Sequence, residues 1–319
     1  MERKSRIRSS LLNKIGWSKS GRLGHGLAIM SAILVLGLGT VARAQMPVPA
    51  ASELPAPVQV VAFTFDWDDN VFEMPTKIML FHKKTGVQRG VSTDDFALIR
   101  DEIGKPGSEF ADFELRQDKS TGSLRYFGDF SEDGTSRFQM DVNGAMETEG
   151  WKGPVWEDFV AAASRKSTAD LTWFVTARLH APATIHGAIQ SMKDKGLIQH
   201  VPPLDNIWPV SEPDFSSRFE RVFGKAPPEG SVDNPSARKA AVMEFILDRI
   251  QATPFPEQVS PVLSPDGRTR GPYHLWGFSD DDYGNYQKAV EVLQKGANAD
   301  RWSHVKITVF FSRERIGQM

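Results

Sequence analysis

Short apolar runs alternate with longer polar stretches along most of the chain. Apolar runs bounded by turn residues predict buried β-strands. The strands predicted in this way cover residues 60–65, 171–175, 207–210, 274–278 and 305–311. Between them, apolar residues at spacings of three and four predict helices over residues 182–195, 237–250 and 283–295. The alternation predicts an α/β fold with a Rossmann-like, mostly parallel sheet flanked by helices.

The interval from about residue 77 to 150 breaks this alternation. It is polar, rich in Gly and Asp, and carries scattered aromatic residues: Phe110, Phe113, Tyr126, Phe127 and Phe130. We expect a small insertion after the first strand. One interpretation is a β-rich lid over a site, and the other is a surface elaboration whose aromatic side chains form a satellite core.

The N-terminal region has the pattern of an export signal. Residues 1–26 are basic, residues 27–40 are apolar, and Ala42-Arg43-Ala44 matches the small-x-small site of signal peptidase. We expect a signal peptide over 1–44 with cleavage after Ala44, and a periplasmic or secreted protein. An uncleaved anchor is the alternative, and the only membrane contact expected. Proline residues in 45–57 predict an extended tether, so the folded domain is expected over 58–319.

Composition narrows the classes of function. A chain of 319 residues with 40% hydrophobic content is long enough for one sizeable core. The net charge of -2 does not favour nucleic acid as a partner. Because the chain has no cysteine, disulfides, a thiolate nucleophile and a sulfur-based zinc site are excluded.

An acidic loop, Asp66-Trp67-Asp68-Asp69-Asn70, follows the first predicted strand. Carboxylates crowded at a strand end repel one another, and a bound cation, a shared proton or a lysine relieves that repulsion. An EF-hand calcium loop is a poor match, because Val71 and Lys77 stand where that loop needs Gly and Glu. A solvated acidic turn and a DxD glycosyltransferase are further alternatives, but neither accounts for the polar residues that follow later strands.

Further polar residues follow the later strands. Thr176 and Arg178 come after the second predicted strand, and Asp280, Asp281 and Asp282 come after the fourth. The carboxyl ends of strands in an open parallel sheet converge on one crevice, so these residues are expected to meet. Lys239 lies near the start of the helix predicted over 237–250.

These motifs together resemble those of the haloacid dehalogenase (HAD)-like hydrolase superfamily. Its members carry DxDx(T/V), then a Thr or Ser ending a strand, then a Lys, and then an acidic pair. All four occur here in that order, from about residue 58 onward, and the 77–150 insertion stands where this superfamily often places a cap. The resemblance implies a magnesium-dependent phosphohydrolase acting on a small phosphate ester, and the signal peptide predicts that it is exported.

The resemblance also implies roles for single residues. Asp66 is the expected nucleophile, because an ionised carboxylate attacks phosphorus without a base and forms an aspartyl phosphate. Asp68 is the expected acid and base. Thr176 and Lys239 are expected to stabilise the transferring phosphoryl group, and Arg178 to reach a substrate anion.

The expected Mg²⁺ ligands are Asp66, the backbone carbonyl of Asp68, Asp280 and Asp281. Asp282 is an alternative to Asp281, with Asn285 as an orienting residue or a turn residue.

Alternatives stay open for the single-residue motifs and for the function. Thr176 also suits a helix cap, and Lys225 and Arg238 compete with Lys239. The chain departs from the family pattern in Asn70, which replaces Thr or Val, and in the bulky Trp67. The competing function is a non-catalytic, cation-dependent periplasmic binding protein on the same scaffold.

Overall fold

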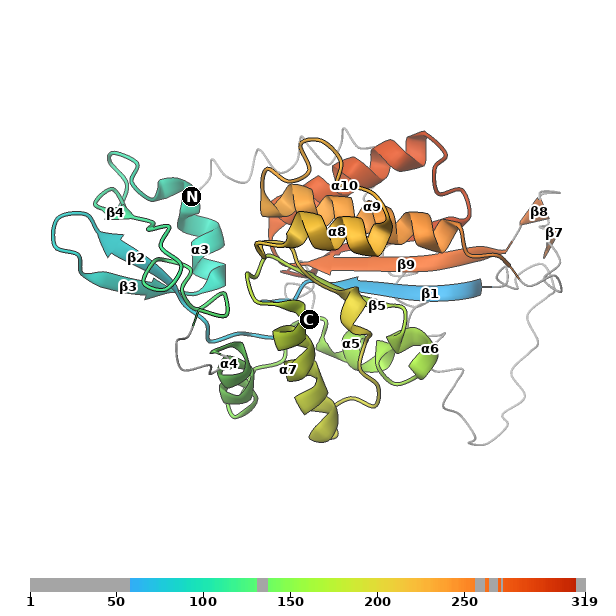
Figure 1. Cartoon of the computed structure of the whole chain (residues 1–319), viewed down its shortest axis with the longest axis horizontal. Coiled ribbons are helices and arrows are strands. Elements are labelled where there is room, and N and C mark those ends of the chain that lie inside the picture. Colours follow the sequence, from blue (N-terminus) through green and yellow to red (C-terminus); the bar gives the residue numbers. More distant parts are fainter. Residues whose placement is uncertain (1–57, 131–136, 256–261, 264–268, 271, 314–319) are drawn as a thin grey trace, which may run out of the picture. The chain divides into compact units, whose positions relative to one another are not determined.

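The computed structural model describes residues 58–130, 137–255, 262–263, 269–270 and 272–313 (Figure 1). The expected signal peptide and tether lie outside these residues. No helix in the described part of the chain has the length and apolar character needed to cross a bilayer.

A five-stranded sheet forms the centre of the fold, with the order β10-β9-β1-β5-β6 and only parallel pairings. Its strands are β1 (Val58–Phe65), β5 (Thr172–Thr176), β6 (Ile207–Pro209), β9 (Tyr273–Asp280) and β10 (Val305–Phe311). All five coincide with predicted strands to within a few residues. The mostly parallel sheet predicted from the sequence is therefore confirmed.

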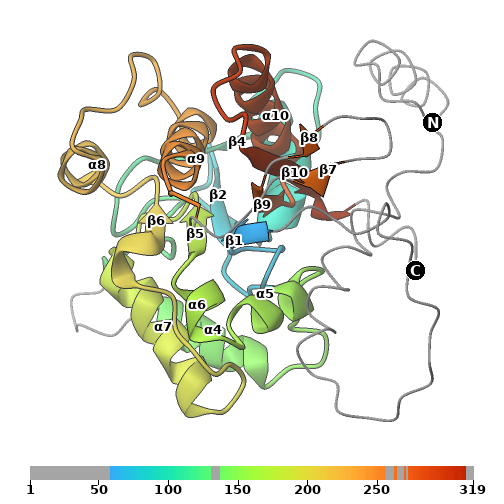
Figure 2. The ribbon, with the colours of Figure 1, turned by 90° about the vertical axis from the view of Figure 1, so that its right-hand side faces the viewer.

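Helices cover both faces of this sheet (Figures 1 and 2). One face carries α8 (Phe215–Phe223), α9 (Pro235–Gln251) and α10 (Tyr283–Asn298). The other carries α4 (Arg137–Met146), α5 (Trp156–Ala162), α6 (Lys166–Ala169) and α7 (Pro182–Asp194). A single 3-10 turn, η3 (Leu204–Asn206), leads into β6. The three helices predicted from apolar spacing are α7, α9 and α10.

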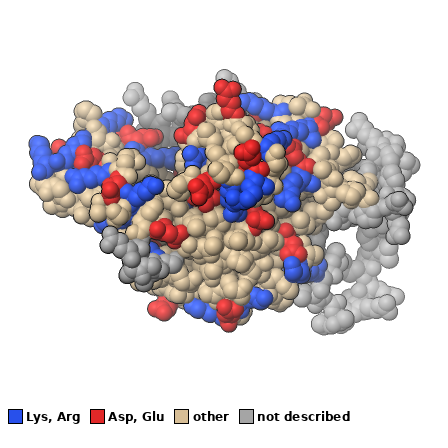
Figure 3. Space-filling view, viewed as in Figure 1, with Lys and Arg blue, Asp and Glu red and all other residues tan. Residues whose placement is uncertain are grey.

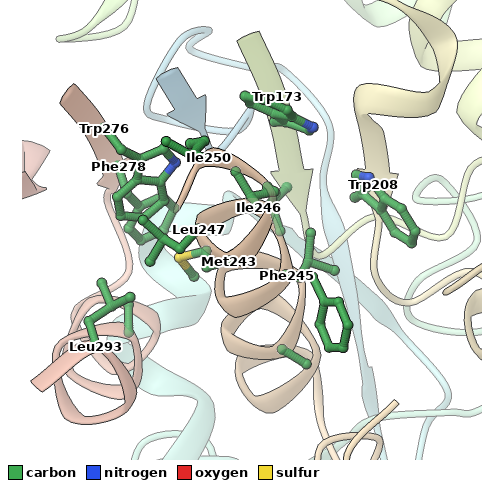
Figure 4. Close-up of a cluster of buried hydrophobic side chains, with 14 of the residues drawn as sticks. Trp173, Trp208, Met243, Phe245, Ile246, Leu247, Ile250, Trp276, Phe278 and Leu293 are labelled. Carbon is green, nitrogen blue, oxygen red and sulfur yellow. The ribbon is translucent and has the colours of Figure 1, made fainter. Parts of the chain in front are cut away.

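The apolar core on the first face is built around α9 (Figure 4). Asn234 caps the start of this helix, because its side chain accepts a hydrogen bond from the Ala237 backbone N–H. Pro235 occupies the first turn. Its buried side chains meet the strand residues Trp173 and Trp276. Since most of α9 is enclosed, any charged group on it has to find partners inside the protein.

The interval after β1 forms a separate small unit. It contains an antiparallel sheet of order β3-β2-β4 and two short helical segments. The elements are β2 (Ile78–His82), β3 (Gln88–Val91), α3 (Thr93–Ile99), η2 (Arg100–Glu102) and β4 (Phe113–Glu114). Its own apolar cluster includes Ile78, Leu80, Val91, Phe110 and Phe127. Elsewhere, β7 (Val262–Leu263) and β8 (Thr269–Arg270) pair in an antiparallel arrangement.

The strand order places a topological switch between β1 and β9. From β1 the chain moves outward through β5 and β6 to one edge, then returns to β9 and continues to β10 at the other edge. In open α/β sheets, ligands bind outside the carboxyl ends of the strands at such a switch. The fold thus points to the residues that follow β1 and end β9.

Candidate functional site

Asp66 and Asp280 lie side by side at this switch. Phe65 pairs with Ser279 in the parallel register, and the Asp66 backbone N–H donates to the Ser279 carbonyl at 3.0 Å. Asp66 is the first residue after β1, and Asp280 is the last residue of β9. The sheet therefore brings together two carboxylates from distant parts of the chain.

Lys239 bridges the two carboxylates. Its Nζ lies 2.9 Å from Asp66 Oδ1 and 2.7 Å from Asp280 Oδ2. Burial alone would lower the pKa of Lys239, but the charges of Asp280 and Asp66 outweigh burial and raise that pKa. The ammonium group is thus fully charged and points into the site.

The competing basic residues lie elsewhere. Lys225 Nζ sits over the Phe245 ring at 4.3 Å. Arg238 donates to the carbonyls of Val232 and Val210. Of the three candidates, the structure brings only Lys239 into contact with Asp66.

A third carboxylate, Asp281, joins this pair. Asp66, Asp280 and Asp281 are all buried, and each offers one oxygen within 4.8 Å of the other two. Burial raises the pKa of Asp66 to about 7 against the opposing charge of Lys239. Burial, followed by repulsion from Asp280, raises the pKa of Asp281 well above its ordinary value.

Three carboxylates outnumber their two cationic partners, Lys239 and Arg313, in this mostly buried place. Hard carboxylate oxygens are the ligands that Mg²⁺ and Ca²⁺ prefer. The donor set therefore fits a divalent cation. It does not by itself distinguish Mg²⁺ from other hard cations.

Asp68 points away from this cluster toward Arg178. Arg178 Nε donates to Asp68 Oδ2 at 2.9 Å, and Nη2 donates to Oδ1 at 2.5 Å. Arg178 has no solvent exposure, and Asp68 is 9% exposed. The residue expected to reach a substrate anion thus holds the residue expected to act as acid and base.

Thr176 ends β5 and is buried. Its carbonyl accepts the Val210 N–H at 2.8 Å. The following helix, α7, has Ala181 as its N-cap residue, so Thr176 does not cap it. The capping alternative is wrong, whereas the hydroxyl's expected contact with a phosphoryl group stays a prediction.

Asp282 serves as the N-cap of α10. Its Oδ1 accepts the backbone N–H groups of Gly284 at 2.6 Å and Asn285 at 3.1 Å. The side chain of Asn285 donates to Asp280 Oδ1 at 3.3 Å. Because the cap occupies Asp282, Asp281 is the better placed partner for Asp280 in a cation site.

Asn70 ties the two central strand ends together. Its Nδ2 lies 3.0 Å from the Asp66 carbonyl, 3.1 Å from the Ser279 carbonyl and 3.0 Å from Ser279 Oγ. The sequence showed Asn70 only as a departure from the family motif. Its contacts with β9 lie 209 positions away, so no local pattern reveals them.

The insertion contacts the acidic loops through polar side chains. Thr93 donates to Asp69, and Arg100 Nη1 donates to Asp282 Oδ2 at 3.0 Å. Arg313, after β10, pairs with Asp281 and with Asp94 of α3. These contacts place α3 next to the carboxylates.

Comparisons with protein-family models, curated proteins and solved structures found no match to this chain. The site must therefore be interpreted from its own geometry.

Proposed function

We propose that this protein is an exported, magnesium-dependent phosphohydrolase of the HAD-like type, acting on a small phosphate monoester through an aspartyl phosphate. The observation that carries the proposal is the buried Asp66–Lys239–Asp280 bridge at the switch between β1 and β9. Lysine-bridged carboxylates at this point join the first, third and fourth motifs of the family in one place.

The proposed reaction starts with Asp66. One of its oxygens attacks phosphorus, and the bond from phosphorus to the ester oxygen breaks as Asp68 gives that oxygen a proton. Asp68 then takes a proton from water, whose oxygen attacks the same phosphorus. The bond to Asp66 breaks, phosphate leaves, and both carboxyl groups return to their starting states.

The remaining residues would offset the negative charge of the phosphoryl group. Mg²⁺, held by Asp66, Asp280 and Asp281, would offset the negative charge of the phosphoryl oxygens. Lys239 would neutralise the same oxygens from the α9 side. The Asp68 backbone carbonyl would be a further Mg²⁺ ligand. The Thr176 hydroxyl would donate a hydrogen bond to the phosphoryl group.

The surface is consistent with a small substrate. Basic and acidic side chains lie interspersed on the face shown in Figure 3, so that face offers no extended basic patch of the kind a polyanionic substrate would need. Export rests on the sequence of residues 1–44, and membrane contact is proposed only through an uncleaved signal segment.

One observation favours a second function. Both Asp68 oxygens accept hydrogen bonds from Arg178, so Asp68 has to serve a leaving group while it keeps these contacts. A non-catalytic, cation-dependent binding protein has no such requirement. In that case the carboxylates hold a cation and the insertion recognises a ligand.

The deciding experiment measures hydrolysis of 4-nitrophenyl phosphate by the purified full chain with Mg²⁺. We expect turnover that falls to background in Asp66→Asn and is unchanged in Asp194→Asn, which alters an exposed aspartate on α7. Melting curves with beryllium fluoride give a second readout. We expect this phosphoryl mimic to stabilise the fold only when Mg²⁺ is present. Stabilisation by Mg²⁺ alone without turnover would support the binding protein instead.

A further inference from the structure

Arg178 is a fully enclosed charged side chain beside Asp68, with no solvent exposure. Its guanidinium contacts Asp68 with two parallel donors, at 2.9 and 2.5 Å. A two-pronged contact of this kind fixes the plane of the carboxylate as well as its distance. Arg178 therefore determines where the two oxygens of Asp68 lie.

Arg178 is in turn held on several sides. Its guanidinium lies over the Phe127 ring at 4.9 Å and over the Phe138 ring at 4.7 Å. Nη2 also donates to Thr76 Oγ1 at 2.9 Å, and that hydroxyl donates to Asp141 Oδ2 at 2.6 Å. The guanidinium is thus fixed by aromatic faces and by a chain of buried hydrogen bonds.

Two of these supports belong to segments outside the sheet. Phe127 lies in the insertion and is part of its apolar cluster. The Phe127 carbonyl accepts the Leu179 N–H at 2.7 Å, one residue after Arg178. Phe138 is part of α4. The insertion therefore contacts Arg178 and its neighbour Leu179 directly, so the position of Arg178 depends on that of the insertion.

We infer that Arg178 is a positioning residue that orients the Asp68 carboxylate for proton transfer and ties its orientation to the docked insertion. The inference rests on the proposed phosphohydrolase function. It replaces the expectation that Arg178 binds a substrate anion, because Nε and Nη2 already serve protein oxygens. Nη1 is buried and makes no hydrogen bond within the described residues, so it is the one atom left for a bound anion.

Leaving groups separate these two roles. A poor leaving group such as an alkoxide needs a proton from Asp68, whereas 4-nitrophenolate leaves without one. A residue that orients Asp68 therefore affects alkyl phosphates far more than aryl phosphates. A residue that binds the phosphate affects both classes equally.

The test compares kcat/KM for glycerol 3-phosphate and 4-nitrophenyl phosphate, using the full chain with Mg²⁺. We expect Arg178→Gln to lower kcat/KM about 100-fold for the alkyl ester and only severalfold for the aryl ester, as Asp68→Asn does. Arg178→Lys keeps the charge but loses the two parallel donors to Asp68, so it should show the same dependence on the leaving group. Arg249→Gln, on the exposed side of α9, should change neither rate.

The double variant Asp68→Asn/Arg178→Gln provides the second readout. If Arg178 acts through Asp68, the double variant is no slower than Asp68→Asn alone. It also avoids leaving an unpaired buried charge, so it keeps the comparison valid even if the single Arg178 variants do not fold.

Two results would count against the inference. A further loss in the double variant, or equal losses for both esters with a raised KM, would assign Arg178 to substrate binding and overturn it alone. A wild-type chain that hydrolyses neither ester would overturn the proposed function and the inference with it.

Discussion

Lys239 keeps its charge in a fully enclosed place because two carboxylates surround it. Its Nζ lies within 3 Å of both Asp66 and Asp280, and its side chain is 1% exposed. Ion pairs of this kind contribute little net stability, but removal of one partner leaves an uncompensated charge. The same lysine thus matters for folding as well as for the proposed chemistry.

Lys239→Met is expected to lower the free energy of unfolding by roughly 3–5 kcal/mol in chelated buffer, because the buried carboxylates lose their counter-charge. Urea denaturation measures the loss. Adding Asp280→Asn to Lys239→Met should recover part of it. Lys225→Met, which alters the competing exposed lysine, should have a small effect. A Lys239→Met variant as stable as wild type would show that the carboxylates are neutral in the folded protein.

Asp69 makes the cation-free protein sensitive to pH. Burial raises its pKa to about 7 from 3.8, against the hydrogen bond from Thr93. Between these values the folded protein holds a proton that the unfolded chain has released. The contribution of Asp69 to stability is therefore most favourable at the acid end and is lost as pH rises through that range.

The expected outcome is that Asp69→Asn gains stability relative to wild type between about pH 4 and about pH 7. The measurement is the difference in unfolding free energy between the two proteins across this range in chelated buffer. A difference that does not vary with pH would show that Asp69 titrates alike in both states.

The sequence identified most of the side chains that meet at the site, because motif order and the convergence of parallel strands place Asp66, Lys239 and Asp280 together. It missed what holds them there. Asn70 was visible only as an unusual motif residue, and Thr76 carried no signal at all. Both act through contacts that become visible only when β1, β9 and α4 are packed.

The strands and helices of the sheet were predictable because their apolar patterns are clear. Every residue of β5 is buried, which explains why apolar and β-branched residues occupy all of its positions. Helix α8 was not expected, although Phe215, Phe219 and Phe223 recur at the four-residue spacing of a helical face. The insertion itself was predicted, as a β-rich lid or as a surface elaboration with a satellite core, but its short strands follow no periodic pattern that fixes their bounds.

The residues at the start of α10 both cap this helix and contact the acidic cluster. Asp282→Ala removes a cap that satisfies two backbone N–H groups and should destabilise the protein by about 1 kcal/mol. Asn234→Ala, at the equivalent place on α9, should lose a similar amount. Only Asp282→Ala should also weaken binding of the proposed Mg²⁺ in calorimetry, because the Asp282 carboxylate holds the backbone of Asn285, whose side chain donates to Asp280. Equal Mg²⁺ affinity in both variants would separate the cap from the site.

The described residues contain distinct apolar clusters in the sheet and in the insertion. Helix α3 has no fully buried residue, and polar contacts link it to the site. Units that share little apolar contact can open independently of one another. The insertion is thus expected to be less stable than the sheet.

Native-state hydrogen exchange measures this directly. Backbone amides of β2 and β3 should exchange with a lower opening free energy than those of β5, and higher salt should lower it further by screening pairs such as Arg100–Asp282. Arg100→Gln should reproduce the salt effect, and Arg116→Gln, which breaks an ion pair within the insertion, should not. Identical opening free energies in β2 and β5 would indicate one cooperative unit.

The hydrogen bonds between Asn70 and Ser279 join residues that lie 209 positions apart in the chain. During synthesis, the ribosome releases Asp66 and then Lys239 before it releases β9, so a nascent polypeptide has only part of the carboxylate set. The proposed cation site is accordingly among the last features to assemble. The proposed cation site would therefore take its ion from the compartment in which the chain finishes folding.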